Sequence, residues 1–131
     1  MYSDGNKQIP NSEVNKIPNL SPSLIKAIAM QESFCGVDNA DILHVNNIGD
    51  WNEYKSSYGL IKGVSPNTWL SLNSGIRILA AKGFKGTFKE DGSCFFKGWA
   101  HAVINYNGGG NNNYLKFVNE MYHEATGSYI Q

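Results

Sequence analysis

The sequence predicts one mostly helical α+β domain, in which a bundle of helices surrounds a central helix that ends in a glutamate, with a loop or short β region between helices. The 131 residues have the length of a single domain, and a hydrophobic content of 41% is ordinary for a globular protein with one core. Four segments combine helix-capping or helix-stopping residues with apolar residues three and four positions apart, and a long segment between the first two has no such period. These observations favour the helical bundle.

The chain is expected to begin with a loosely packed N-terminal arm over residues 1–20, which hold two prolines and many Asn, Ser and Lys residues. Residues 21–131 would form the folded domain. The polar start lacks the apolar segment of a signal peptide, so the sequence suggests a domain of a larger parent protein, or a protein that secretion machinery delivers.

The first firm helix is expected over residues 21–35. Ser21 suits the N-cap because its side chain can accept a hydrogen bond from the first turn, and Pro22 suits the first helical position. Gly36 suits the position just after the helix, where a left-handed residue is common.

Glu32 lies at the end of the apolar face of this helix. Ile25, Ile28 and Ala29 are three and four residues apart, and Glu32 continues their row. Partial burial and the negative end of the helix dipole would both raise the pKa of its carboxyl group. A carboxylic acid that holds its proton near neutral pH can act as a general acid. The alternative is an ordinary solvated glutamate near a helix end.

The later segments complete the bundle. Residues 37–64 are rich in Asn and Gly and are expected to form loops, with brief strands over 41–45 and 58–61. Gly75 predicts a close contact or a break in the next helix. A loop or hairpin is expected over residues 84–96. Three more helices are expected, over residues 65–82, 97–106 and 113–124. The last of them has Leu115, Val118 and Tyr122 in one apolar row.

Charge and spacing exclude several classes of function. Lysine plus arginine equals aspartate plus glutamate, 11 each, so no basic field exists for nucleic acid or an anionic membrane. No segment approaches the roughly 20 apolar residues of a membrane span. The three histidines are isolated and no C-x-x-C occurs, so neither a metal site nor a cofactor is expected. Cys35 and Cys94 leave open either one disulfide or two buried thiols.

Four blocks of the sequence, in order, resemble the lysozyme-like superfamily of peptidoglycan-degrading domains, which holds SLT-type lytic transglycosylases and goose-type lysozymes. The blocks are I-K-A-I-A-M-Q-E-S-F (residues 25–34), D-I-L-H-V-N-N (41–47), S-P-N-T-W-L-S-L-N-S-G-I-R-I-L-A (65–80) and A-V-I-N-Y-N-G-G (102–109). The family usually has Gln where His44 stands. A second candidate for that block is residues 58–62, which has Lys62 in the Gln place.

The resemblance implies that residues 21–131 are a catalytic domain that cleaves the β-1,4 bond between N-acetylmuramic acid and N-acetylglucosamine in the glycan strands of peptidoglycan. Glu32 would be the catalytic acid. With no partner carboxylate, the N-acetyl group of the substrate would attack the anomeric carbon, as in a lytic transglycosylase. Four loop residues are candidates for a second carboxylate, as in a hydrolysing muramidase, and no spacing selects one of them: Asp38, Asp41, Asp50 and Glu53.

The expected substrate-binding residues around Glu32, from the resemblance or from their own side chains, are Ser33, His44, Asn46, Trp51, Tyr106 and Asn107. Four of them have a plainer interpretation as well. Ser33 would bond back to a helix carbonyl, His44 would be a loop histidine, and Tyr106 would be a core residue. Asn107 would be a left-handed helix stop, and Trp51 is the best of three tryptophans for stacking on sugar rings.

The rival to an enzyme is an inactive glycan-binding module on the same fold. Glu32 followed by Ser33 favours the enzyme. The expected location is the bacterial cell envelope (periplasm) or the exterior after secretion. Phage lysis, assembly of a secretion system and an antibacterial toxin would all use this chemistry, and a toxin would need an immunity protein as a partner.

Overall fold

The computed structural model describes residues 2–4, 7–9, 11–47, 49, 51–85, 94–109 and 112–131, with side chains described from Ile9 onward except that of Asn112. The described chain is mostly helical, with two small two-stranded antiparallel sheets. The elements in chain order are β1 (Tyr2–Asp4), β2 (Lys7–Ile9), α1 (Asn11–Val14), α2 (Pro22–Ser33), the 3-10 helix η1 (Glu53–Tyr58), α3 (Thr68–Lys82), β3 (Phe84–Lys85), β4 (Phe95–Phe96), α4 (Trp99–Tyr106) and α5 (Asn112–Thr126).

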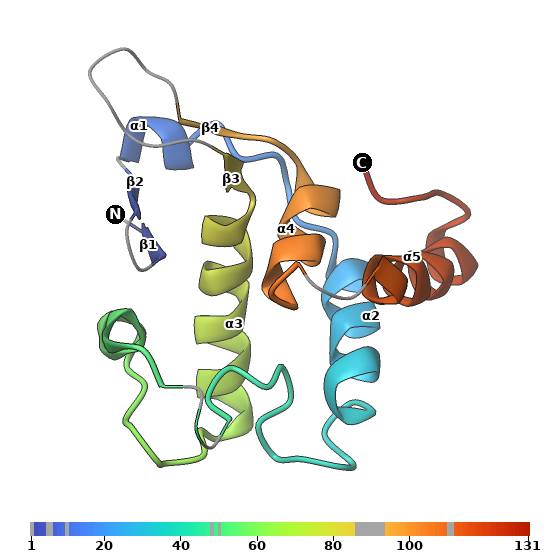
Figure 1. Cartoon of the computed structure of the whole chain (residues 1–131). Coiled ribbons are helices and arrows are strands. Elements are labelled where there is room, and N and C mark those ends of the chain that lie inside the picture. Colours follow the sequence, from blue (N-terminus) through green and yellow to red (C-terminus); the bar gives the residue numbers. More distant parts are fainter. Residues whose placement is uncertain are drawn as a thin grey trace.

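Four of the helices pack against one another in the order α3, α4, α5 and α2 (Figure 1). Figure 1 shows the short helix α4 between α3 and α2, and the irregular segments between residues 34 and 67 at one end of α2 and α3. The glutamate-bearing helix α2 therefore lies at one end of the series. It supplies Leu24, Ala27, Ile28 and Ala29 to the main core, and its central place in a lysozyme-like bundle stays a prediction.

Helix α2 begins and ends as its sequence predicts, within two residues. Ser21 is the N-cap, and its hydroxyl accepts a hydrogen bond from the backbone N–H of Ser23 at 3.3 Å. The helix ends one turn before Gly36, because Phe34 and Cys35 adopt left-handed backbone conformations with φ of 52° and 55°. Glu32 is thereby in the last helical turn.

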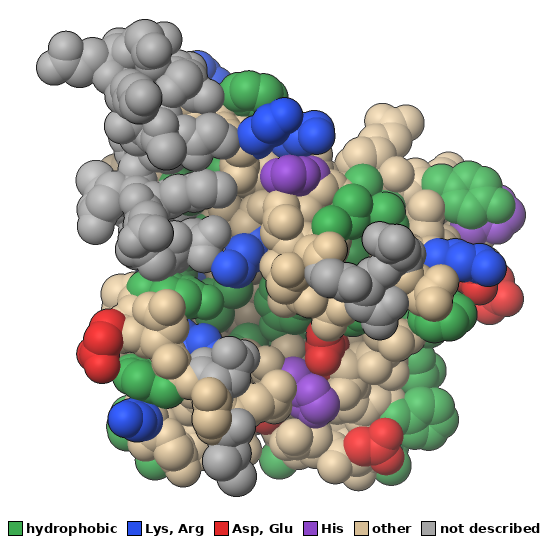
Figure 2. Space-filling model, in the orientation of Figure 1, with side chains coloured by type: hydrophobic (Ala, Val, Ile, Leu, Met, Phe, Trp, Pro, Cys, Tyr) green, Lys and Arg blue, Asp and Glu red, His purple; other side chains and the backbone are tan. Residues whose placement is uncertain are grey.

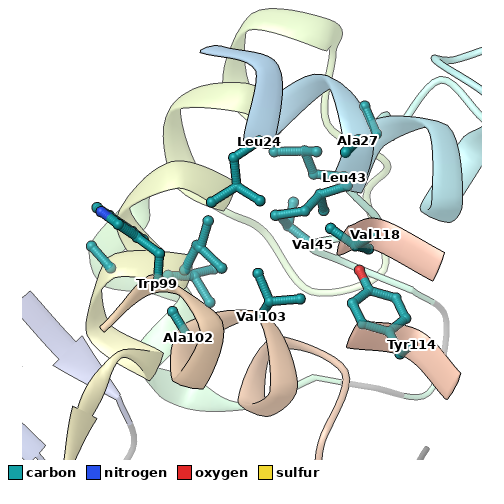
Figure 3. Packing of buried hydrophobic residues seen from close by; sticks show 14 of the residues in the cluster. Leu24, Ala27, Leu43, Val45, Trp99, Ala102, Val103, Tyr114 and Val118 are labelled. Atoms are coloured by element: carbon teal, nitrogen blue, oxygen red, sulfur yellow. The ribbon is translucent and has the colours of Figure 1, made fainter. Parts of the chain in front are cut away.

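The main core lies between the helices and also takes in two residues of the loop after α2 (Figure 3). Figure 3 shows Leu43 and Val45 from this loop among side chains of α2, α4 and α5. Gly75 makes that packing possible, because a Cβ atom there would lie 2.5 Å from Leu43 Cδ1 and 3.1 Å from Val45 Cγ1. The predicted close contact at Gly75 is confirmed, and α3 runs through it unbroken.

A second, smaller core joins the N-terminal segment to the end of α3. Ile9 is fully buried there against Ala81, Phe84 and Cys94. β1 pairs with β2, with Tyr2 opposite Ile9, and β3 pairs with β4, with Phe84 opposite Phe96. The β3–β4 pairing agrees with the predicted loop or hairpin over residues 84–96, of which residues 86–93 lie outside the described part.

Two predictions for the region between α2 and α3 are wrong. Residues 41–45 and 58–61 are not strands; the first forms turns, and the second ends η1 and continues as loop. Backbone N–H groups that a strand would pair with a neighbour are instead bonded to the side chain of Asp41 (below).

The two cysteines do not bond to each other, because Cys35 is exposed after α2 and Cys94 is buried in the second core. In the part of the chain that the structure describes, no helix has both the length and the apolar character needed to cross a membrane.

Candidate active site

The side chain of Glu32 lines a cleft of about 470 Å³, which lies between the loop after α2, η1, α3 and the end of α4. Its side chain is 15% exposed. Figure 2 shows a hollow near the middle of the face in view, with acidic and histidine side chains on one side and lysine or arginine side chains on the other. The residues that line the cleft are Glu32, His44, Val45, Asn47, Asn52, Tyr54, Lys55, Ile78, Lys82, Asn105, Tyr106, Asn107 and Gly108.

The two carboxyl oxygens of Glu32 have different neighbours. The hydroxyl of Tyr114, on α5, donates a hydrogen bond to Oε1 at 2.7 Å. The ring nitrogen Nδ1 of His44 lies 3.3 Å from Oε2. Both neighbours therefore fix the orientation of the carboxyl group from elements that are distant in the sequence.

The pKa of Glu32 is raised above its ordinary value of 4.5, as the sequence predicts. Burial is the largest cause, because it disfavours the charged form, and the nearby charge of Asp41 acts in the same direction. The hydrogen bond from Tyr114 and the charge of His44 lower it in part. Burial outweighs these two contacts, so Glu32 holds its proton to a higher pH than an exposed glutamate does.

The loop that carries His44 is built around Asp41. This carboxylate is 2% exposed and accepts hydrogen bonds from the backbone N–H groups of Val45 at 3.0 Å and Asn46 at 2.9 Å. It also accepts one from the hydroxyl of Ser71, on α3, at 2.7 Å. Within this loop His44 adopts a left-handed backbone conformation with φ of 49°. Its Nε2 atom is buried and has no hydrogen-bond partner among the residues that the structure describes.

Tyr106 is the last residue of α4. Its side chain lines the cleft with Glu32, but its hydroxyl donates to the backbone carbonyl of Leu43. Burial raises the pKa of Tyr106 well above 10, so this hydroxyl keeps its proton. Tyr114 supplies the direct hydrogen bond to Glu32 instead.

Asn107 lines the cleft next to Tyr106. Its backbone has φ of −90° and ψ of 19°, so the interpretation as a left-handed helix stop is wrong. Gly108 and Gly109 take that conformation, with φ of 77° and 76°. They turn the chain where a residue with a Cβ atom would be strained.

Three of the predicted substrate-binding residues lie outside the lining of the cleft. The buried hydroxyl of Ser33 contacts the carbonyls of Ala29 and Ile42 at 3.2 and 2.7 Å, so it ties α2 to the loop of His44. The side-chain amide of Asn46 donates to two carbonyls of the loop before α3, both at 2.8 Å. Trp51 is half-buried against the core, and its indole N–H donates to Glu53 at 3.1 Å.

The three candidates for a second carboxylate that the structure describes do not line the cleft with Glu32. Asp41 is used by the loop, Glu53 bonds to Trp51, and Asp38 is exposed after α2. Asp50 lies outside the described residues. Among the residues that are described, Glu32 is the one carboxylate that lines the cleft.

Sequence reasoning misses several polar residues in or next to the cleft. The most important is Tyr114, which bonds to Glu32 but does not line the cleft, and its signal is weak: it precedes Val118 by four residues in the apolar row of α5. Asn52 and Tyr54 belong to η1 and its N-cap, a short 3-10 helix with no apolar period to reveal it. In the described residues no group of three His, Cys, Asp or Glu side chains could hold a metal ion.

Protein-family models, curated proteins and solved structures were compared with this chain, and none matches. The chemistry of the cleft therefore follows from its own groups. Glu32 is a carboxyl group with a raised pKa, held by Tyr114 and His44 in a site lined by asparagine amides and a tyrosine ring. Such a group can give a proton to a leaving oxygen and take one back, beside amide groups that can form hydrogen bonds with a polar ligand.

Proposed function

We propose that this protein is a lytic transglycosylase with a lysozyme-like fold, which cleaves the β-1,4 bond between N-acetylmuramic acid and N-acetylglucosamine in peptidoglycan. The observation that carries the proposal is that Glu32, with its raised pKa, is the one carboxyl group among the described residues that lines the cleft. A glycosidase that works with one carboxyl group needs it both as an acid and as a base, so its pKa must lie near the working pH.

The cleft supports the proposal because all four family-like blocks contribute to it. The first block supplies Glu32, the second supplies His44, and the third supplies Ile78 from α3. The fourth supplies Tyr106 and Asn107. Segments that resemble one family in sequence thus line one site in space, although they lie far apart in the chain.

The reaction would have two steps. In the first, Glu32 gives its proton to the glycosidic oxygen while the C1–O bond of the muramic acid residue breaks, and the oxygen of its N-acetyl group bonds to C1. In the second, the Glu32 carboxylate takes the proton of the 6-hydroxyl group as O6 bonds to C1 and the N-acetyl oxygen leaves. The product is a 1,6-anhydromuramic acid end, and Glu32 has its proton back.

The lining of the cleft fits such a glycan. The amides of Asn47, Asn52 and Asn107 can both donate and accept hydrogen bonds with sugar hydroxyl and N-acetyl groups. Lys55 and Lys82 contribute positive charge to the same cleft, which suits the carboxylates of the muramic acid side chain and its peptide. In this proposal the enzyme acts in the bacterial cell envelope or after secretion.

Muropeptide mass spectrometry of digested sacculi tests the proposal. The wild-type protein is expected to release fragments with 1,6-anhydro ends, and Glu32→Gln is expected to release none. Glu53→Gln is the matched control, because Glu53 is a carboxylate outside the cleft lining and its substitution should leave the yield unchanged. Reducing ends in place of anhydro ends would make the protein a hydrolase. No fragments from the wild type would contradict an enzyme on this substrate.

A further inference from the structure

The carboxyl group of Glu32 is held asymmetrically. Oε1 accepts the hydrogen bond of the Tyr114 hydroxyl at 2.7 Å, and Oε2 faces Nδ1 of His44 at 3.3 Å. Tyr114 itself is 4% exposed, and burial raises its pKa far above 10, so its hydroxyl stays protonated at any working pH. Oε1 therefore faces a permanent donor.

A permanent donor decides which oxygen of a neutral carboxyl group is the hydroxyl. In a carboxylic acid the carbonyl oxygen is the better acceptor, and the oxygen that bears the proton is the weaker one. With Tyr114 donating to Oε1, the neutral acid is more stable with the carbonyl at Oε1 and the proton at Oε2.

His44 faces the other oxygen, Oε2, and its contact of 3.3 Å is longer and weaker than the 2.7 Å bond of Tyr114, so the Tyr114 bond decides the assignment. If Nδ1 lacked a proton, the neutral ring would carry its N–H at Nε2, where a buried donor would have no acceptor. With the proton on Nδ1, the buried Nε2 is a bare lone pair. Nδ1–H then faces Oε2 and can donate to it when Glu32 is ionised, and the proton of the neutral acid points away from the ring.

From this asymmetry we infer that Oε2 is the oxygen from which the Glu32 proton leaves and to which it returns, and that Tyr114 is the positioning residue that makes it so. The substrate in this inference rests on the proposed function, but the assignment of the proton does not. Tyr114 would act through Glu32, with no contact to the glycan of its own.

The charged and titratable groups around Glu32 set the direction of a pH effect. His44 and Asp41 act from the loop, and Tyr114 acts from α5. Tyr106 on α4 and two lysines on η1 and α3 line the same cleft. Of these, the Tyr114 hydrogen bond is the largest influence that lowers the pKa of Glu32, so its removal would leave that pKa higher still.

Infrared difference spectroscopy tests the assignment without any substrate. Subtracting the spectrum of Glu32→Gln isolates the carbonyl stretch of protonated Glu32. A hydrogen bond to the carbonyl oxygen weakens the C=O bond, so Tyr114→Phe is expected to move this band to higher wavenumber. Tyr122→Phe is the matched control, since Tyr122 lies on the same helix, half-buried, and lines a different pocket. An unmoved band in Tyr114→Phe would overturn the inference.

A second experiment, which uses labelled tyrosine, covers the case in which the Tyr114→Phe variant does not fold. Fluorotyrosine incorporated throughout the protein makes every tyrosine hydroxyl a stronger donor and keeps the Tyr114 contact. The isolated Glu32 band is then expected to move to lower wavenumber, and a band at its unlabelled position would contradict donation to the carbonyl oxygen.

Digestion of sacculi over a range of pH gives the functional readout. Tyr114→Phe is expected to shift the alkaline limb of the rate profile to higher pH, because Glu32 keeps its proton longer, and to lower the maximal rate about tenfold. An unshifted limb would overturn the positioning role. Sacculi left intact by the wild type would contradict the proposed function, while the infrared result would still decide the assignment of the proton.

Discussion

The hydroxyl of Tyr106 donates a hydrogen bond to the backbone carbonyl of Leu43, across 63 residues of sequence. The bond joins the C-terminal end of α4 to the loop that carries His44 beside Glu32. Two walls of the cleft are thus fastened to each other at a position next to the candidate acid. The contact makes Tyr106 a structural residue of the site as well as a lining residue.

Removing this hydroxyl should loosen the loop. Tyr106→Phe leaves the carbonyl of buried Leu43 without its donor, which is expected to lower the free energy of unfolding by about 1–3 kcal/mol. Urea unfolding followed by circular dichroism measures the change. Tyr129→Phe, at an exposed tyrosine, is the control and should leave the midpoint unchanged. Equal midpoints for Tyr106→Phe and wild type would show that the bond adds nothing to stability.

The raised pKa of Glu32 has a signature in the pH dependence of stability. The folded state holds this proton to a higher pH than the unfolded state, in which the pKa is about 4.5. The resulting contribution to stability is present below that value and is lost as the pH rises through the folded-state pKa. Glu32→Gln removes it, so the difference in melting temperature between the variant and the wild type should change in favour of the variant as the pH rises. A difference that stays constant between pH 4 and pH 8 would contradict the raised pKa.

The hydroxyl of Ser71 is expected to contribute more to the free energy of unfolding than an exposed serine hydroxyl does. It donates to Asp41 at 2.7 Å and accepts from the backbone N–H of Leu43 at 3.0 Å, fully buried. Ser71→Ala leaves the backbone N–H of Leu43 without its partner and removes one of the donors to Asp41, which keeps those of Val45 and Asn46, and it should cost about 1–3 kcal/mol in chemical denaturation. Ser56→Ala, which removes an exposed hydroxyl bonded to Glu53, should cost little. The prediction fails if the two substitutions have the same effect.

Gly75 offers a test of the contact between α3 and the loop. Alanine is favoured over glycine in a helix by about 1 kcal/mol, but overpacking costs about 1–3 kcal/mol. The added Cβ atom would meet Leu43 Cβ and Val45 Cγ1, both at 3.1 Å, so we expect Gly75→Ala to be destabilising. Asn73→Ala, on the exposed face of the same helix, should be neutral or stabilising. Thermal unfolding compares the two variants. A Gly75→Ala variant more stable than the wild type would show that the loop shifts to accommodate the added Cβ atom.

The helices could be predicted from sequence because their signals are local. The segment expected over residues 97–106 is α4, Trp99–Tyr106, and the segment expected over 113–124 is α5, Asn112–Thr126. Capping residues and apolar spacing act within a few residues of each other, so one sequence suffices to find them.

The loop between α2 and α3 could not be predicted in the same way. Its conformation depends on Asp41, whose partner Ser71 is 30 residues away. No local sequence pattern predicts that these two residues form a hydrogen bond. The same reason hides Tyr114, which reaches Glu32 from 82 residues away. Glu32, by contrast, could be predicted because it continues the apolar row of a helix. The family-like blocks predict His44, Tyr106 and Asn107, which line the cleft with it.

The carboxylate of Asp41 has a consequence for how the cleft meets its ligand. Residues 41–47 have no regular secondary structure, yet the hydrogen bonds to Asp41 hold their backbone, including the left-handed His44. The conformational entropy of this loop is therefore lost during folding, before any ligand arrives. A ligand that enters the cleft meets a preorganised wall, and its association is not opposed by the ordering of seven flexible residues (about 1–2 kcal/mol each for a backbone).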